Sequence, residues 1–305
     1  MSGHWLLRPV ALLAITGASA MLLSAQETNY RTALPGTVNY VEGQASINGT
    51  PLTTRQDGNT QVEPNETLST ANGKVEMLLS PGVFVRLGDN SEVRLVSNGL
   101  VNPTIEVTRG ETMLEADNKL HDMQLTVLEH GAAASVLKTG LYRFNADQGN
   151  IAVLDGKLKV TENDKSADFG KGHELLLDDP QMKTSHFDVK AHDDLYAWSS
   201  VRSSYLAQAN QMTAQNAYVG AGPWWGPGWY WSPYFDTWSW LPGDGWFYSP
   251  FGYPFYSPGF VIYGGGLYRG RAFAPRGGYR AFTGGSFRGA PAFRGGGGFR
   301  GGGRR

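Results

Sequence analysis

The sequence predicts an all-β protein with one helix and a disordered Gly/aromatic/Arg-rich tail. Between residues 34 and 180, short runs of β-branched and apolar residues alternate at regular spacing with Gly, Asn, Asp or Pro. One later stretch repeats apolar residues at three- and four-residue steps, which is the period of a helix. Glycine accounts for 41 of the 305 residues, and most of the excess follows residue 217, where a packed core is not expected.

The first 25 residues are typical of a signal peptide. A short segment with one cation precedes residues 10–25, which carry no charge and are rich in Ala and Leu. Small residues at Ala18-Ser19-Ala20 and Ser24-Ala25 predict a mature chain that starts at Met21 or Gln26. We therefore expect an exported protein of the periplasm, cell surface or extracellular space. An uncleaved signal anchor in the inner membrane is the alternative, because about 17 uncharged residues reach the short limit of a membrane span.

Residues 34–180 are expected to form one β-domain of short strands. Asn48-Gly49 is a two-residue hairpin signal, and Asn72-Gly73 and Pro81-Gly82 also predict turns. Because no helical period interrupts the strands, they form either antiparallel pairs or a short solenoid. In the strand over 83–87, Arg86 alternates with apolar neighbours, so we expect its side chain to face water.

Residues 187–216 are predicted to contain a helical linker. Asp193 or Asp194 is suited to cap its first turn. The apolar stripe packs either on the β-domain or on a partner or membrane surface. Its members are Leu195, Trp198, Val201, Tyr205, Leu206, Ala209 and Met212.

Residues 217–263 form a Trp/Tyr/Pro/Gly-rich low-complexity segment. Seven of the nine tryptophans lie between Trp224 and Trp246, and prolines among them interrupt helices and strand ladders. This pattern predicts extended, sticky chain. The alternative is local collapse, or coverage of an apolar face, because each Trp or Tyr buries a large area.

Residues 264–305 are rich in Gly, Arg and Phe and contain no acidic residue, which predicts a tail that is disordered until bound. The chain as a whole carries a formal net charge of −1, so the part before this tail is acidic. The tail is a candidate for binding anionic lipid, polysaccharide or extracellular nucleic acid, and a plain solubilising role is the alternative. The candidate polyanion-binding residues are Arg269, Arg271, Arg276, Arg280, Arg288, Arg294, Arg300, Arg304 and Arg305.

The sequence offers no catalytic, cofactor-binding or metal-binding motif. The absence of cysteine excludes disulfides, thiolate metal sites and Cys nucleophiles. His186 and His192 are the nearest approach to a metal cluster, but their spacing is not that of a zinc site. Asp178-Asp179 follows a strand and is expected to solvate a turn. We therefore expect a binding or scaffolding protein and not an enzyme, and self-association is left open.

From about Gly36 to Asp178 the sequence resembles the FecR domain. Each motif is short, and their order along the chain carries the resemblance. They include Gly36-Thr37-Val38, Leu68-Ser69-Thr70, Gly73-Lys74-Val75-Glu76, Ser91-Glu92-Val93-Arg94-Leu95, Thr139-Gly140-Leu141-Tyr142-Arg143-Phe144 and Gly170-Lys171-Gly172-His173-Glu174-Leu175.

The resemblance implies a periplasmic, non-enzymatic β-domain whose partner is an envelope protein or polysaccharide. In the signalling members of the family, this domain relays the state of an outer-membrane transporter to a cytoplasmic sigma factor. Those members carry a cytoplasmic segment before a membrane helix, and the stretch before Val10 is too short to match it. The leading expectation is an exported envelope protein with an adhesive tail. The alternative is a membrane-anchored periplasmic sensor.

Overall fold

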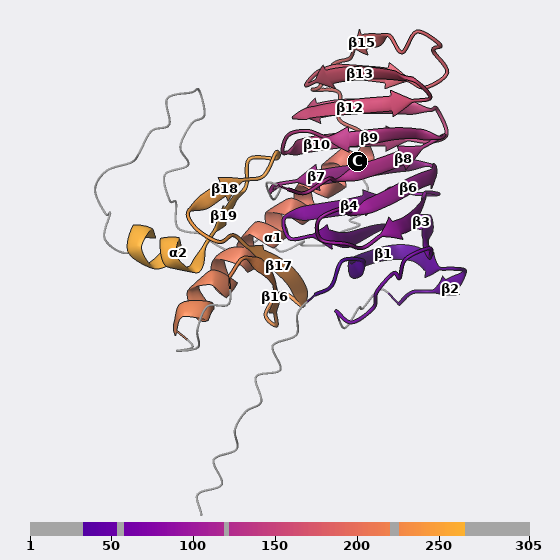
Figure 1. The fold of residues 1–305 in the computed structure, drawn as a ribbon. Coiled ribbons are helices and arrows are strands. Elements are labelled where there is room, and N and C mark those ends of the chain that lie inside the picture. Colours follow the sequence, from indigo (N-terminus) through magenta and orange to yellow (C-terminus); the bar gives the residue numbers. More distant parts are fainter. Residues whose placement is uncertain (1–32, 54–57, 119–121, 220–225, 266–305) are drawn as a thin grey trace, which may run out of the picture.

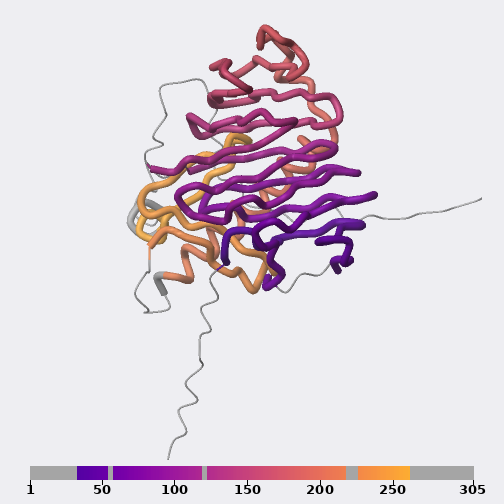
Figure 2. The backbone as a smooth tube through the Cα atoms, turned by 45° about the vertical axis from the view of Figure 1, so that its right-hand side comes forward, coloured from indigo at the N-terminus to yellow at the C-terminus, as the bar shows by residue number. Residues whose placement is uncertain are grey.

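Most strands of the protein belong to one sheet that folds over on itself into two layers. The computed structural model describes residues 33–53, 58–118, 122–219 and 226–265. The predicted signal peptide and all nine candidate arginines of the tail lie outside these residues. Figure 2 shows the strands stacked like rungs, starting from the indigo N-terminal strands. The all-β prediction for the domain is confirmed.

The first layer contains six strands, β5 (Glu92–Ser97), β6 (Thr104–Arg109), β8 (Thr126–Glu129), β9 (Ala132–Val136), β12 (Lys157–Glu162) and β13 (Lys165–Gly170). The second layer contains β4 (Val83–Leu87), β7 (Glu111–Ala116), β10 (Gly140–Asn145), β11 (Asn150–Asp155), β14 (His173–Leu176) and β15 (Thr184–His186). Within the described part of the sheet, every pair of neighbouring strands is antiparallel except β6 and β8. The antiparallel alternative is therefore the correct one.

Strand β3 (Thr67–Ser80) connects the two layers. Its first residues pair with β5 and its last residues pair with β4. Strand β1 (Thr37–Ile47), which forms a hairpin with β2 (Thr50–Pro51), runs antiparallel along the whole of β3. The ribbon of β1 and β3 therefore bends where the sheet passes from one layer to the other.

Gly43 and Gly73 lie opposite each other in this ribbon, next to a register shift. A Cβ atom on Gly73 would come within 2.5 Å of the backbone of Glu42 and Gln44. The turn predicted at Asn72-Gly73 is wrong, because both residues lie inside β3. Glycine here permits two backbones to approach closely, which a sequence pattern does not distinguish from a turn. The turns at Asn48-Gly49 and Pro81-Gly82 are confirmed, with positive φ at Asn48, Gly49 and Gly82.

The main core lies between the layers. On β4, Val83, Val85 and Leu87 are fully buried in it. In the first layer, successive residues of a strand point alternately into this core and out to solvent, as in β12. The strands β4 and β7 of the second layer are instead buried on both faces. Something other than the first layer must therefore cover the outer face of the second layer.

Helix α1 (Asp194–Val219) provides part of this cover (Figure 1). Asp193 is its N-cap, because Oδ1 of Asp193 accepts a hydrogen bond from the Tyr196 backbone N–H at 2.7 Å. The helix packs on the β-domain, which was one of the two alternatives. Leu195, Leu206 and Ala209 are buried as the stripe predicts, whereas Val201 and Tyr205 are about half exposed. Among the described residues, no helix is long and apolar enough to cross a membrane.

The aromatic segment after the helix is folded. It contains β16 (Gly228–Ser232), β17 (Thr237–Leu241), β18 (Trp246–Tyr248), β19 (Pro254–Tyr256) and α2 (Pro258–Gly265). The expectation of disordered chain is therefore wrong over residues 226–265, and the alternative of coverage is correct. Trp238 and Trp240 are buried in a cluster with Leu78 and Phe84 from the outer face of the sheet. Pro233 follows β16 and Pro242 follows β17, so these prolines mark strand ends.

Candidate functional site

Four charged side chains meet between the second layer and the segment that covers it. We call this covering segment, residues 194–265 in their described part, the C-terminal module. Arg86 Nε donates a hydrogen bond to Glu76 at 2.9 Å, and Arg86 Nη1 pairs with Glu115. From helix α1, Arg202 Nη2 donates to Glu76 at 2.8 Å. Two arginines and two glutamates on four elements thus form one buried cluster.

The expectation that Arg86 faces water is wrong, since its side chain is 0% exposed. The strand alternation is as predicted, because Arg86 points away from the core that holds Val85. The outer face, however, is occupied by the module. Burial of a charge is tolerated here because each partner carries the opposite charge and accepts hydrogen bonds.

Neutral groups connect the cluster to the aromatic hairpin of β16 and β17. Asn39 Nδ2 donates to Glu76 at 2.9 Å, and Asn39 Oδ1 accepts a hydrogen bond from the Trp238 backbone N–H at 2.8 Å. On the helix side, the Ser203 hydroxyl donates to Glu115 at 2.8 Å. Both parts of the module, helix and hairpin, are therefore attached to the same charged centre.

The cluster sets the protonation of its carboxyl groups. Burial alone would raise the pKa of Glu76, but the charges of Arg202 and Arg86 outweigh it and hold that pKa at about 2. Burial, with the nearby charge of Glu115, raises the pKa of Asp117 well above its usual range. Glu76 is therefore an anion paired with two cations, and Asp117 is a neutral neighbour.

A second group of charges holds the start of helix α1. Arg143 Nη1 on β10 donates to the N-cap carboxylate of Asp193 at 3.1 Å, and its guanidinium lies 5.6 Å from the ring centre of Phe187. Glu111 also lies next to Arg143, with 3.6 Å between Glu111 Oε1 and Arg143 Nε. Burial and the charge of Asp193 raise the pKa of Glu111 to about 7, although Arg143 opposes them. The helix is thus attached to the sheet at its N-cap and in its middle.

Aromatic rings on the outward face of the hairpin of β18 and β19 form the clearest exposed feature of the module. Trp246 and Tyr248 are 41% and 55% exposed, and their ring centres lie 4.7 Å apart at nearly a right angle. Tyr256 lies opposite Trp246, and its ring stacks on Phe260 of α2 at 5.8 Å. We call Trp246, Tyr248, Tyr256 and Phe260 the aromatic surface.

The aromatic surface is fixed from behind. Phe247 and Phe255 point to the opposite side of the hairpin, where both contact the buried ring of Trp240. Asn210 of helix α1 donates to the carbonyls of Trp240 and Tyr256 and accepts from the Tyr256 N–H. The rings are therefore held on a framework that reaches back to the charged cluster. In Figure 1, α2 and the hairpin of β18 and β19 lie on the side of the molecule away from β12 and β13.

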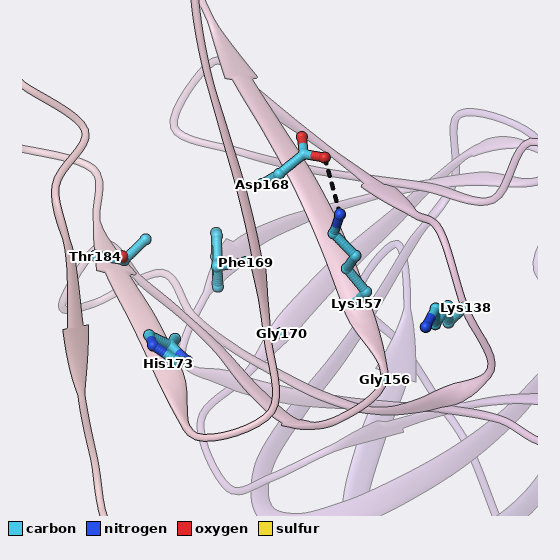
Figure 3. Close-up of a pocket in the computed structure, with 8 residues that line it drawn as sticks. All are labelled: Lys138, Gly156, Lys157, Asp168, Phe169, Gly170, His173 and Thr184. Atoms are coloured by element: carbon cyan, nitrogen blue, oxygen red, sulfur yellow. Dashed lines mark ion pairs between the residues drawn. The ribbon is translucent and has the colours of Figure 1, made fainter.

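A shallow pocket of about 420 Å³ lies at the other end of the sandwich (Figure 3). Of its two lysines, Lys138 and Lys157, the second is paired with Asp168 at 3.2 Å, and His173 lies on the neighbouring wall. An ion pair beside a histidine gives the pocket charge but no nucleophile activated by a base. The lining residues are Lys138, Gly156, Lys157, Asp168, Phe169, Gly170, His173 and Thr184.

The histidines singled out in the sequence are separated in the fold. His186 lies against His173, with 4.1 Å between ring centres, whereas His192 stacks on Tyr196 at 3.7 Å. Across the described ranges, no three His, Asp or Glu side chains are grouped as metal ligands. Asp179 accepts hydrogen bonds from the N–H groups of Gln181 and Lys183, so its predicted role in a turn is confirmed.

Sequence reasoning missed both the charged cluster and the aromatic surface. The first has a sequence signal, because Glu76, Arg86 and Glu115 each stand between two apolar residues of a strand. The second has the i and i+2 spacing of Trp246 and Tyr248 in a strand. Neither pattern shows which helices and strands pack against these residues.

Comparison with known proteins finds a family match within the β-domain. Residues 66–159, from the start of β3 to the start of β12, match the family model described as FecR protein. No curated protein matches the chain. Two crystal structures of a proposed anti-sigma factor from Parabacteroides distasonis ATCC 8503 are similar, at 15% and 14% identity and a TM-score of 0.35 each.

These matches span 44% and 45% of this chain and 62% and 64% of the solved chains, so this chain covers less than two thirds of either. The family match lies within the stretch from Gly36 to Asp178 over which the sequence resembles the FecR domain. Residues 66–159 are thus similar to the FecR family, and the β-domain that contains them carries the C-terminal module on one outer face.

Proposed function

We propose that this chain is an exported, non-enzymatic binding protein of the bacterial cell envelope. In this proposal the FecR domain is a scaffold, and the C-terminal module that it holds presents a binding surface to an envelope protein or polysaccharide. The observation that carries the proposal is the direction of the module's aromatic rings. Trp238 and Trp240 fix the module to the sheet, whereas Trp246 and Tyr248 point outward.

Charge placement supports binding over catalysis. Glu76 and Glu115 are paired with arginines under the module, where they hold two parts of the fold together. Lys157 in the shallow pocket is paired with Asp168. Groups that serve acid–base or nucleophilic chemistry must instead reach a substrate with a free proton or lone pair.

Export is supported by the uncharged stretch over 10–25 and the small-residue sites that follow. The test is to fractionate the producing bacterium and to sequence the N-terminus of the recovered protein. We expect it outside the cytoplasm with a start at Met21 or Gln26, and we expect the purified mature chain to co-sediment with isolated cell envelopes. An intact Met1 in the cytoplasm, with no envelope binding, would contradict the proposal.

A regulator of the FecR signalling type is the second candidate, and the match over residues 66–159 is the observation that favours it. The same experiment separates the two candidates. A regulator is expected in the membrane fraction with its N-terminus uncleaved, and its deletion should change transcription of a transport operon.

A further inference from the structure

We propose that His173 and His186 together bind one divalent transition-metal ion, each through one imidazole nitrogen. The two residues lie on neighbouring strands at the end of the second layer. This site is separate from the charged cluster and from the aromatic surface. The inference goes beyond the proposed function and does not depend on it.

The strand register places the two side chains next to each other. His173 on β14 lies directly opposite His186 on β15. Just before them, the Phe187 N–H donates to the Gly172 carbonyl at 3.1 Å, so residues 172 and 187 form a hydrogen-bonded pair. The next pair along an antiparallel ladder is of the non-hydrogen-bonded kind, in which facing side chains stand closest. The backbone itself therefore holds the two imidazoles together.

The spacing of the rings fits a shared ion. Their centres lie 4.1 Å apart and their planes are tilted by 44°. Two nitrogens bound to one tetrahedral ion lie about 3.3 Å from each other. A small rotation of either side chain brings two ring nitrogens to that separation. His192, by contrast, stacks on Tyr196, which offers no second nitrogen.

A backbone contact prepares His173 as a ligand. Its Nδ1 lies 3.3 Å from the Lys171 carbonyl oxygen. Because a carbonyl oxygen only accepts hydrogen bonds, Nδ1 carries the proton, and Nε2 keeps its lone pair. Histidines that bind metals have this arrangement, in which the other ring nitrogen donates to a carbonyl or carboxylate. The side chain of His186 is exposed, so an ion can reach it from solvent.

The surroundings admit a cation. Two nearby lysines are neutralised, because Lys171 is paired with Asp155 at 3.1 Å and Lys157 with Asp168 at 3.2 Å. In Figure 3, Lys138 lies on the side of the pocket away from His173. Since His173 lines this open pocket, water can fill the coordination positions that two histidines leave free.

The donor set selects the class of ion. Imidazole suits Cu²⁺, Ni²⁺ and Zn²⁺, whereas Mg²⁺ prefers oxygen ligands. Among the first group, a site of given donors binds Cu²⁺ most tightly. We therefore expect affinity to fall from Cu²⁺ to Zn²⁺, with no measurable binding of Mg²⁺.

The test is isothermal titration calorimetry of the untagged mature chain with each of these three ions. The variants are His173→Gln and His186→Gln, and the matched control is His192→Gln, which removes an imidazole outside the pair. Electron paramagnetic resonance of the Cu²⁺ complex counts the bound nitrogens, and circular dichroism checks that each variant is folded.

We expect the parent chain and His192→Gln to bind Cu²⁺ equally, with two imidazole nitrogens on the ion. Loss of a partner that only orients a ligand lowers metal affinity by about 10–100-fold. Loss of a ligand itself should therefore weaken Cu²⁺ binding at least about tenfold in His173→Gln and in His186→Gln, and each should remove one nitrogen from the spectrum.

Equal Cu²⁺ affinity of the parent and His186→Gln would overturn the inference, and so would an equal loss in His192→Gln. If His173→Gln does not fold, His186→Gln decides the question, because it changes an exposed side chain of a three-residue edge strand. Envelope binding measured in the presence of a chelator tests the proposed function separately.

Discussion

Arg202 in helix α1 and Glu76 in strand β3 are hydrogen-bonded at 2.8 Å, although 126 residues separate them. Both side chains are buried, and the Arg202 guanidinium lies 4.0 Å from the centre of the Tyr40 ring. A charge that has left water needs its partner on the other side of the interface. This pair therefore fixes where the helix lies on the sheet.

Replacing Arg202 should release the C-terminal module. In Arg202→Leu, Glu76 keeps only Arg86 as a charged partner, and the helix loses one of its buried hydrogen bonds to the sheet. We expect limited proteolysis to cut within residues 226–256 at least several-fold faster than in the parent chain, while residues 34–180 stay protected. Tyr205→Ala, on the half-exposed side of the same helix, should leave the pattern unchanged. Equal protection of the module in both variants would contradict this role of Arg202.

Arg86→Leu should be among the most destabilising single changes in the domain. It leaves the buried carboxylates of Glu76 and Glu115 with one arginine fewer, and breaking a buried pair in this way costs about 3–5 kcal/mol. The matched control is Arg94→Leu, which breaks a part-exposed pair with Glu106 in the first layer and should cost less than about 1 kcal/mol. Urea denaturation measures both values, and similar losses would show that the cluster is accessible to water.

These residues show where sequence reasoning reached its limit. The strand over 83–87 and its alternation are local properties, so Val85 in the core was predictable from neighbours alone. Whether the opposite face meets water depends on Trp238 and Arg202, which lie more than a hundred residues away. A local pattern carries no information on that contact.

Glu129 should make the domain less stable as the pH rises. It lies on β8, fully buried on the same side as Val127, and burial raises its pKa to about 8. Since the folded state holds the proton more tightly than the unfolded state, stability is lost between the ordinary pKa and about 8. Glu129→Gln should therefore gain stability relative to the parent by up to about 1.4 kcal/mol per pH unit across that range.

Urea denaturation at several pH values measures this difference, and Glu129→Leu should remove the same pH dependence. If parent and variants lose stability in parallel as the pH rises, the carboxyl group is ionised in the folded protein.

The bend of the β1–β3 ribbon should not tolerate a side chain. A Cβ in Gly73→Ala meets backbone atoms at 2.5 Å, which cannot move without separating the strands. The control Gly228→Ala, in β16, meets its nearest atom at 3.9 Å. We expect Gly73→Ala to lower the midpoint of thermal unfolding by several degrees and Gly228→Ala to change it little, as measured by circular dichroism. A similar midpoint for both would mean that the ribbon bends elsewhere.

The fold of the C-terminal module, unlike that of the β-domain, does not follow from the local sequence pattern of its own residues. Its tryptophans and prolines predict sticky extended chain when taken alone, because short strands cannot bury them. They fold here because Leu78 and Phe84 offer an apolar surface on which Trp238 and Trp240 pack. The apolar period of the sequence predicts helix α1 itself. It does not predict that Arg202 and Ser203, which are polar and lie outside the apolar stripe, are buried against the sheet.

The charged centre of the covered face has a consequence for folding. All strands of the second layer, up to β15, precede the tryptophans of β17 in the chain, so this layer can form before the module covers it. During that interval Glu76, Arg86 and Glu115 are solvated by water between the apolar patches of Leu78 and Met113. A nascent domain with such a face is less prone to stick to other chains than one with a wholly apolar face. The same residues thus keep the half-made protein soluble and later attach its last part.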